Sequence, residues 1–248
     1  SRKYYETMLQ NVMRPAIDMI GAVEIDPPLQ LNGAADIEEV ADYCEWDYHI
    51  GHLVDAGRAG FEIPRFHVPL WAFDEVDAFL GHDKQPVVIT LRETGAQPER
   101  NSQLEEWLKF ARSIQDRHSV LFLRDTALAS ERLDANEFPI WPRASENAYV
   151  RAALYQRAFC NLMVGNGPVA WCLFSDAPFL AFKQLIPALP NWVGGQPEGW
   201  REQCHLEVGE QLPWSTPQQR LTWTDDTFEN IAQAFNDFVR GVELQNAA

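Results

Sequence analysis

One stretch, residues 158–182, constrains the fold more than any other part of the sequence. It opens with a short and mainly apolar run, residues 159–164, which turn residues end at once. Such a run is typical of a central parallel strand that is covered on both faces. The turn Gly165-Asn166-Gly167-Pro168 follows, and a proline suits the first position of a helix, where no backbone N–H is needed. The stretch therefore predicts a strand, a tight turn and the start of a helix.

The same turn predicts an anion site. Open α/β sheets bind ligands at their carboxyl edge, and the free N–H groups at a helix start favour a phosphate there. We expect Asn166, Gly167 and Pro168 to be binding residues of such a site. An ordinary strand-to-helix turn is the alternative, because glycine and proline occur in loops of every kind.

Beyond residue 86 the chain alternates between predicted strands and helices. Strands are expected at residues 87–91, 119–123, 138–140, 159–164 and 177–182, and helices at residues 103–114, 147–159 and 227–239. Residues 183–220 are rich in Pro, Gly, Gln and Trp and are expected to be irregular. The alternation predicts an α/β fold with a Rossmann-like parallel sheet flanked by helices and joined by right-handed crossovers.

Residues 1–85 carry a different pattern and predict a mainly helical amino-terminal segment. Helical spacing is found in residues 1–22, with Pro15 as a kink or break, in residues 36–60 and in residues 71–80. A loop is expected between the first two, and residues 61–70, which hold two prolines, predict an extended connector or edge strand. The chain begins directly on a helix, as expected of a fragment of a longer protein. We divide it at residue 85.

The charge balance excludes one class of partner. The chain has 36 acidic and 20 basic residues, a formal charge of -16, and only four of the basic residues are lysines. A surface of this kind has no basic patch that could bind a phosphate backbone, so we expect no binding of nucleic acid.

Cysteine usage and hydropathy indicate the compartment. The four cysteines form no CxxC pair, and Cys160 and Cys172 lie in the predicted core, as expected of reduced thiols in a cytosolic protein without a zinc site. The longest apolar stretch is interrupted by Asn161, Asn166 and Pro168, and no signal peptide opens the chain. We expect a soluble, cytoplasmic protein without a membrane span.

Two arginines flank the polar loop of residues 92–102, which follows the strand predicted at 87–91. Because carboxyl ends of parallel strands share one edge, this loop and the turn after residue 164 are expected to converge. Arg92 and Arg100 can each hold phosphate oxygens with two hydrogen bonds. Further donors are offered by Thr94, Asn101 and Ser102. The alternative is that both arginines form weak surface ion pairs with Glu93, Glu99 or Glu105.

Residues 49–52 read HIGH, the signature of class I aminoacyl-tRNA synthetases. That signature follows a first Rossmann strand and works with a lysine-rich loop, and this sequence has neither, so we reject the match. We interpret these histidines as capped or solvent-exposed helix residues; the alternative is a general base supplied by Asp47, His49 or His52. Asp125 and Asp176 are interpreted as following strands, where they would contact a ribose or an acceptor, or cap helices.

Several motifs occur in a recognisable order. They are a helix (NAYVRAALYQRA), a strand (FCNLMVG), the turn NGP, a helix (VAWCLF) and a strand (APFLAF), preceded by VVITLRETGAQPERNSQLEEWLKFAR. This order resembles the carboxyl-terminal, donor-binding domain of GT-B glycosyltransferases, in particular heptosyltransferase-like members. The resemblance covers residues 86–182. It implies that residues 86–248 form a nucleotide-sugar-binding domain and that residues 1–85 are a remnant of an acceptor domain.

The resemblance also implies a reaction, the transfer of a sugar from a nucleotide-sugar to a glycan or surface-polysaccharide acceptor. Arg92 and Arg100 would be catalytic, because they would stabilise charge on the departing diphosphate without a metal or a further cofactor. The other donor-site residues would be Thr94, Asn101, Ser102, Asn166 and Gly167. The first 85 residues are fewer and more helical than a second Rossmann domain. The alternatives are therefore a non-catalytic interaction protein on the same scaffold and a nucleotide-sugar epimerase.

Overall fold

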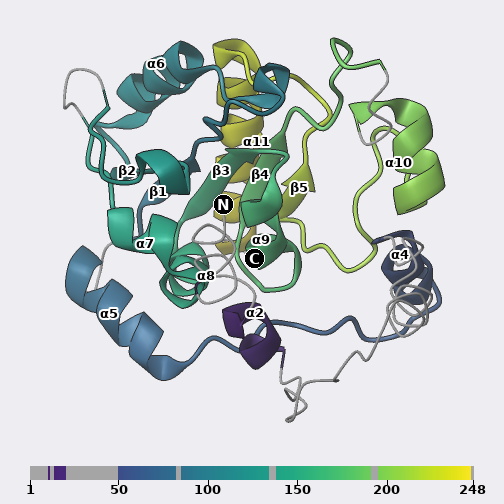
Figure 1. The fold of residues 1–248 in the computed structure, drawn as a ribbon, viewed down its shortest axis with the longest axis horizontal. Coiled ribbons are helices and arrows are strands. Elements are labelled where there is room, and N and C mark those ends of the chain that lie inside the picture. The colour runs from purple at the N-terminus through teal and green to yellow at the C-terminus, as the bar shows by residue number, and fades with distance from the viewer. Residues whose placement is uncertain are drawn as a thin grey trace, which may run out of the picture.

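The computed structural model describes residue 11 and residues 14–20, 50–81, 85–133, 138–190 and 195–246. These residues form a five-stranded sheet with helices on both of its faces (Figure 1). Its strands are β1 (Val87–Thr90), β2 (Val120–Leu123), β3 (Cys160–Val164), β4 (Phe179–Phe182) and β5 (Gln219–Leu221). The predicted α/β fold with a parallel sheet is confirmed.

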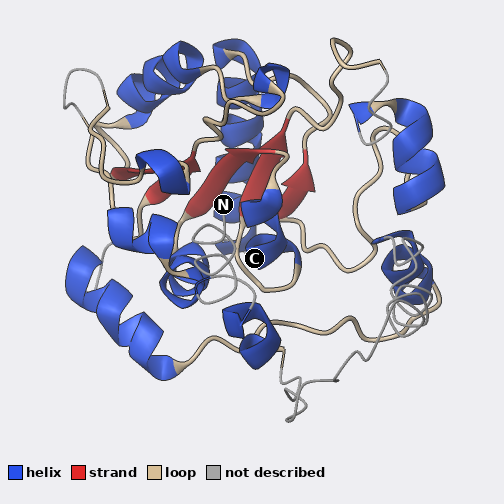
Figure 2. Cartoon of the chain, in the orientation of Figure 1, coloured by secondary structure: helices blue, strands red, loops and turns tan. Residues whose placement is uncertain are grey.

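The strand order is β2-β1-β3-β4-β5, and every neighbouring pair is parallel, as the arrows in Figure 2 show. Val87 pairs with Val120 on one side and with Cys160 on the other, so β1 lies inside the sheet. Every residue of β1 to β4 is buried. This explains why these strands read as short apolar runs in the sequence.

Two helices cover one face of the sheet. These are α6 (Leu104–Ile114) and α11 (Phe228–Asn246). Their apolar stripes, which include Trp107 and Phe235, pack with Val87, Ile89 and Leu162 in one core cluster. The buried side of each helix thus carries the apolar residues that recur with the helical period.

The opposite face is covered by α7 (Pro142–Glu146), α8 (Ala148–Arg157) and α9 (Ala170–Leu173). Val88, Leu121 and Met163 of the strands pack against them in a second core cluster. Strand neighbours point to opposite faces, which is why Val87 and Val88 belong to different clusters. The result is a layer of helices on each side of one sheet.

The described parts of the amino-terminal segment pack on this second face. They are α2 (Arg14–Met19), α4 (Ile50–Arg58) and α5 (Leu70–Leu80). Met19, Val54 and Val76 belong to the same core cluster as Val88. Residues 61–69 run as an extended connector, as predicted, and Pro15 lies in the first turn of α2, where its missing N–H breaks no hydrogen bond. The loop predicted after residue 21 and the start of the helix predicted from residue 36 lie outside the described residues.

Two segments differ from the prediction. Residues 138–140 form only an isolated bridge between Ile140 and Phe122 instead of a strand. The region predicted to be irregular contains α10 (Pro197–Cys204) and β5. Strand β5 was not predicted because two of its three residues are polar. It is held in place by buried Gln219, whose Nε2 donates to the carbonyls of Cys172, Ser175 and Ala177.

Three single turns of 3-10 helix complete the described elements: η2 (Pro98–Arg100), η3 (Thr126–Leu128) and η5 (Gly167–Val169). None of the helices in the described ranges combines the length and the apolar character needed to cross a membrane.

Candidate functional site

The chain leaves β1 and β3, which are neighbours in the sheet, toward opposite faces. After β1 it continues into α6, and after β3 it continues into α9, which covers the other face. Such a divergence is a topological switch point, and open α/β sheets bind their ligands at the carboxyl ends of the strands on either side of it. Thr90 pairs with Met163, so the two strands end at nearly the same level.

The two loops that leave this switch point touch each other. The Nη2 of Arg100, in the loop of residues 92–102, lies 3.4 Å from the carbonyl oxygen of Gly165. The expectation that this loop and the turn after β3 converge at one edge is therefore confirmed. Binding of a ligand between them stays a prediction.

Arg92 lies inside the loop and holds it together. Its guanidinium donates to the carbonyl oxygens of Ala96 (2.8 Å) and Gln97 (3.1 Å) and to the Oδ1 of Asn101. Only 8% of the residue is exposed, and this burial lowers the pKa of Arg92. These contacts, all to neutral oxygens, make Arg92 a support of the loop. They are neither the surface ion pair nor the open phosphate contact that the sequence suggested.

The predicted polar ligands of the loop also bond within it. The Nδ2 of Asn101 donates to the carbonyl of Thr94 (2.9 Å), and its Oδ1 accepts from the backbone N–H of Thr94 (3.2 Å). The hydroxyl oxygen of Ser102 accepts from the backbone N–H of Arg92 (2.9 Å). Thr94, Asn101 and Ser102 therefore give the loop its shape.

Arg100 sits at the junction of the two loops. Its Nη1 donates to the side-chain oxygen of Gln97 (3.0 Å), and the residue is partly buried. The pKa of Arg100 is lowered, first by its removal from water and then by the charge of Arg92. An arginine still carries its full charge at neutral pH, so two like charges lie together at this edge. An anion placed beside them would be attracted.

The turn after β3 offers donors of its own. Within the described part of the chain, the backbone N–H groups of Asn166 and Gly167 donate to no protein group. The Oδ1 of Asn166 is buried and has no hydrogen-bond partner among these residues. Gly167 is exposed, and a Cβ built on it would meet no atom within 4 Å. Space and donors thus coincide at Gly167.

The helix predicted to start at Pro168 is shorter than expected. It consists of η5 and the four-residue α9. The hydroxyl of Ser175 donates to the carbonyl of Trp171 (2.7 Å), and the chain leaves the helical conformation there. So short a helix adds little dipole field, and the donors of this turn act as individual N–H groups.

Sequence reasoning missed two charged residues at the same edge. Lys183 directly follows β4, and its Nζ donates to the carbonyl of Asn101 (2.8 Å). The same Nζ lies 3.3 Å from the carboxylate of buried Asp226. The only available signal was the position of a rare lysine immediately after a predicted strand.

The candidate aspartates divide between the two edges. Asp125 follows β2, and its carboxylate accepts from the backbone N–H of Thr126 (2.9 Å) and of Glu93 (3.3 Å). Asp176, in contrast, precedes β4, so its expected place past a strand was wrong. It lies at the amino edge, where Arg65 pairs with it at 2.8 Å.

His52, the one histidine candidate among the described residues, belongs to α4, which packs on α10. His52 is exposed in α4, and its ring centroid lies 6.1 Å from that of His205. His205 in turn bonds to Asp55, with 2.6 Å between Nδ1 and Oδ2. Asp47 and His49 lie outside the described residues.

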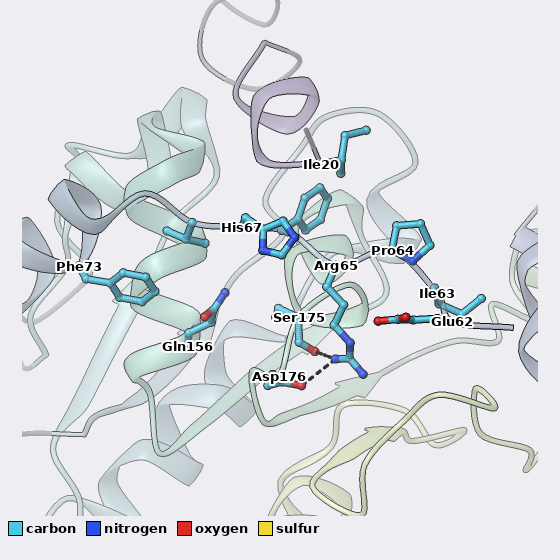
Figure 3. Close-up of a pocket in the computed structure, with 12 residues that line it drawn as sticks. Ile20, Glu62, Ile63, Pro64, Arg65, His67, Phe73, Gln156, Ser175 and Asp176 are labelled. Atoms are coloured by element: carbon cyan, nitrogen blue, oxygen red, sulfur yellow. Dashed lines mark hydrogen bonds and ion pairs between the residues drawn. The ribbon is translucent and has the colours of Figure 1, made fainter. Parts of the chain in front are cut away.

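A depression of ≈ 680 Å³ opens at the amino edge of the sheet (Figure 3). His67 and Gln156 line it, and Figure 3 shows Arg65 turned toward Ser175 and Asp176. The Nη1 of Arg65 donates to both, at 2.7 Å and 2.8 Å. This depression contains none of the predicted donor-site residues, and its arginine is already bonded.

Among the residues that the structure describes, no group of three or more His, Cys, Asp and Glu side chains is placed to hold a metal ion. Comparison of the chain with protein-family models, with curated proteins and with solved structures gave no match.

Proposed function

We propose that the carboxyl edge at β1 and β3 binds the diphosphate of a nucleotide-sugar. The protein would transfer the sugar to a glycan or surface-polysaccharide acceptor, as a GT-B-like glycosyltransferase or its donor-binding half. The contact between Arg100 and Gly165 carries this proposal. It brings a guanidinium to the turn where the N–H groups of Asn166 and Gly167 have no protein acceptor in the described chain.

The chemistry of sugar transfer suits such an edge. As the bond between sugar and diphosphate breaks, negative charge grows on the departing phosphate oxygens. Cations and N–H donors that are already in position stabilise this charge, which is the largest contribution to catalysis in many enzymes. In this scheme Arg100 and the amides of the turn contact the diphosphate, and no metal is required. Arg92 supports the loop and adds its charge nearby.

A cytoplasmic location belongs to the same proposal. Cys160 and Cys172 are free and buried, which suits a reducing compartment.

Isothermal titration calorimetry tests the binding step. The probes are inorganic pyrophosphate, UDP, dTDP, GDP, ADP and the corresponding nucleotide-sugars. We expect saturable binding of at least one, weakened about tenfold or more by Arg100→Ala, because a hydrogen bond to a charged group contributes about 1.5–3 kcal/mol. Arg240→Ala is the control, since it removes the same charge from α11. Absence of heat with every probe would refute the proposal.

A second variant tests the position of the ligand. Gly167→Ala adds a methyl group into open space, and so does the control Gly241→Ala on α11. Neither glycine has a positive φ, so both proteins should fold normally. We expect Gly167→Ala to weaken binding and Gly241→Ala to leave it unchanged. Equal affinity of the two variants would place the ligand elsewhere.

Product analysis separates the reaction from its alternatives. Incubation with the bound nucleotide-sugar and a glycan acceptor should give a longer glycan and free nucleotide. A changed sugar that still carries its nucleotide, formed without acceptor, would instead identify an epimerase. Binding without any turnover would identify a non-catalytic protein.

A further inference from the structure

Lys183 joins two segments that meet at the carboxyl edge. It is the first residue after β4, and only 12% of its side chain is exposed. Its Nζ donates to the carbonyl oxygen of Asn101 (2.8 Å) and lies 3.3 Å from a carboxylate oxygen of Asp226. Lys183 thus connects the loop of residues 92–102 to the turn that precedes α11.

Asp226 is a fixed anchor for this lysine. The residue is completely buried, and its carboxylate accepts from the backbone N–H of Gln103 (2.8 Å), the Nε2 of Gln103 (3.1 Å) and the Nε1 of Trp107 (2.8 Å). A buried carboxylate is stable only when hydrogen-bond donors and a counter-charge surround it. Gln103 and Trp107 supply the donors, and Lys183 supplies the charge. The ammonium group is therefore held by a buried carboxylate, and the exposed carboxylate of Asp225 adds a longer contact at 3.7 Å.

The backbone of Lys183 shows the same constraint. Its φ is +58°, in the left-handed region that residues other than glycine seldom adopt. Its N–H donates to the carbonyl of Thr224 (2.9 Å), which holds this conformation. Backbone strain of this kind is found most often at functional sites, where the surrounding structure maintains it.

The contact with Asn101 reaches the candidate site directly. Asn101 braces Arg92 and Thr94 with its side chain, while Lys183 holds its carbonyl oxygen. Arg100 is the preceding residue and contacts Gly165. A shift of Asn101 would therefore move the Arg100 guanidinium away from the turn.

We propose that Lys183 is a positioning residue of the carboxyl-edge site: held on Asp226, it fixes the Asn101 carbonyl and so places the Arg100 guanidinium beside the carbonyl of Gly165. This inference rests on the proposed function, because it assigns Lys183 to the same diphosphate site. It goes further by naming a residue that acts through Arg100 without touching the ligand.

A double-mutant cycle tests the inference, with inorganic pyrophosphate as the calorimetric probe. The variants are Lys183→Met, Arg100→Ala and the double variant. We expect Lys183→Met to weaken pyrophosphate binding about tenfold, which corresponds to about 1.4 kcal/mol. In the Arg100→Ala background, the same substitution should change affinity less than about twofold, since coupled effects do not add.

The control is Lys109→Met, an identical substitution on the exposed face of α6, where the lysine pairs with Glu229 at 3.6 Å. It should leave pyrophosphate binding unchanged. If Lys183→Met fails to fold, Lys183→Met/Asp226→Asn replaces it in the cycle, because this pair removes both charges together. Thermal melts of each variant establish that the fold is intact.

The outcomes separate the two proposals. Unchanged binding by folded Lys183→Met overturns the inference and leaves the proposed function standing. Additive losses in the double variant also overturn it, because they show that Lys183 acts on binding independently of Arg100. Failure of the unmodified protein to bind any of the diphosphate probes refutes the proposed function and, with it, this role of Lys183.

Discussion

Replacement of Arg124 by methionine should destabilise the protein strongly, because it leaves the largely buried carboxylate of Glu93 without its counter-charge. Arg124 follows β2, and its guanidinium donates from Nη2 (2.6 Å) and Nε (2.9 Å) to the two oxygens of Glu93. Its Nη1 also donates to the carbonyls of Glu131 (2.9 Å) and Arg132 (3.2 Å). The side chains of the pair are only 10% and 14% exposed.

The magnitude follows from this burial. Removal of one partner of a buried ion pair costs about 3–5 kcal/mol, because the remaining charge stays out of water without compensation. The pair Arg143–Glu75 has the same two-bond geometry, at 2.8 Å and 3.3 Å, but its side chains are 48% and 34% exposed. Exposed pairs contribute only about 0.2–1 kcal/mol. Arg143→Met is therefore a matched control.

Urea unfolding measures the free energy of unfolding for both variants against the unmodified protein. We expect Arg124→Met to lose about 3–5 kcal/mol and Arg143→Met to lose about 1 kcal/mol or less. Arg124→Lys should fall between the two, because an ammonium group keeps the charge but cannot form the paired contacts. Equal losses in Arg124→Met and Arg143→Met would refute the reasoning that burial determines the cost.

Three further predictions concern other buried groups. Burial alone would raise the pKa of Asp226, but hydrogen bonds and the charge of Lys183 outweigh it and lower that pKa below the ordinary 3.8. This carboxylate therefore stabilises the fold above pH 3.8 and loses that effect as the pH falls below it. Asp226→Asn should therefore make the free energy of unfolding less dependent on pH in the acid range. Gly51→Ala should cost about 1–3 kcal/mol, because its Cβ would lie 2.8 Å from the backbone oxygen of Gln203. Tyr155→Phe should cost about 1–3 kcal/mol, because it leaves the buried Thr90 hydroxyl, 2.8 Å from the Tyr155 oxygen, without its partner.

Each of these predictions has a measurement and a contrary result. Urea midpoints of the Asp226→Asn and unmodified proteins, compared between about pH 4 and pH 2.5, should converge as the carboxylate becomes protonated; parallel curves would contradict the prediction. Urea unfolding of Gly51→Ala is compared with that of Gly241→Ala, whose new methyl meets no atom within 4 Å. Equal stability of the two variants would contradict the prediction, because it would show that α4 can shift away from α10 without cost. Tyr155→Phe is read from its thermal melt, and an unchanged melting temperature would show that another donor serves Thr90.

The central strands could be predicted because their apolar runs follow from burial on both faces. Val87–Thr90 and Cys160–Val164 are examples, and the loops after them were correctly expected at one edge. Strand β5 could not be predicted in this way. Gln219 and Arg220 are polar, and the strand is held by bonds from Gln219 to carbonyls more than forty positions earlier in the chain.

The site shows the same limit at the level of single side chains. The sequence located Arg92 at the carboxyl edge but not its partners, which are carbonyls of a loop that passes through Gln97 in a left-handed conformation (φ 52°). The same holds at the start of α6, where the backbone N–H of Gln103 donates to Asp226, 123 positions away. Such distant partners leave no local pattern.

The packing of the amino-terminal helices has a consequence for anyone who shortens this chain. Ala72 and Val76 of α5 are completely buried and belong to the same core cluster as Leu154 of α8 and Val88 of β1. A protein that began at residue 86 would expose to water the apolar surface of α8 that α5 now covers. The boundary at residue 85 is therefore a change of sequence pattern rather than a place to cut, and the two parts should melt together.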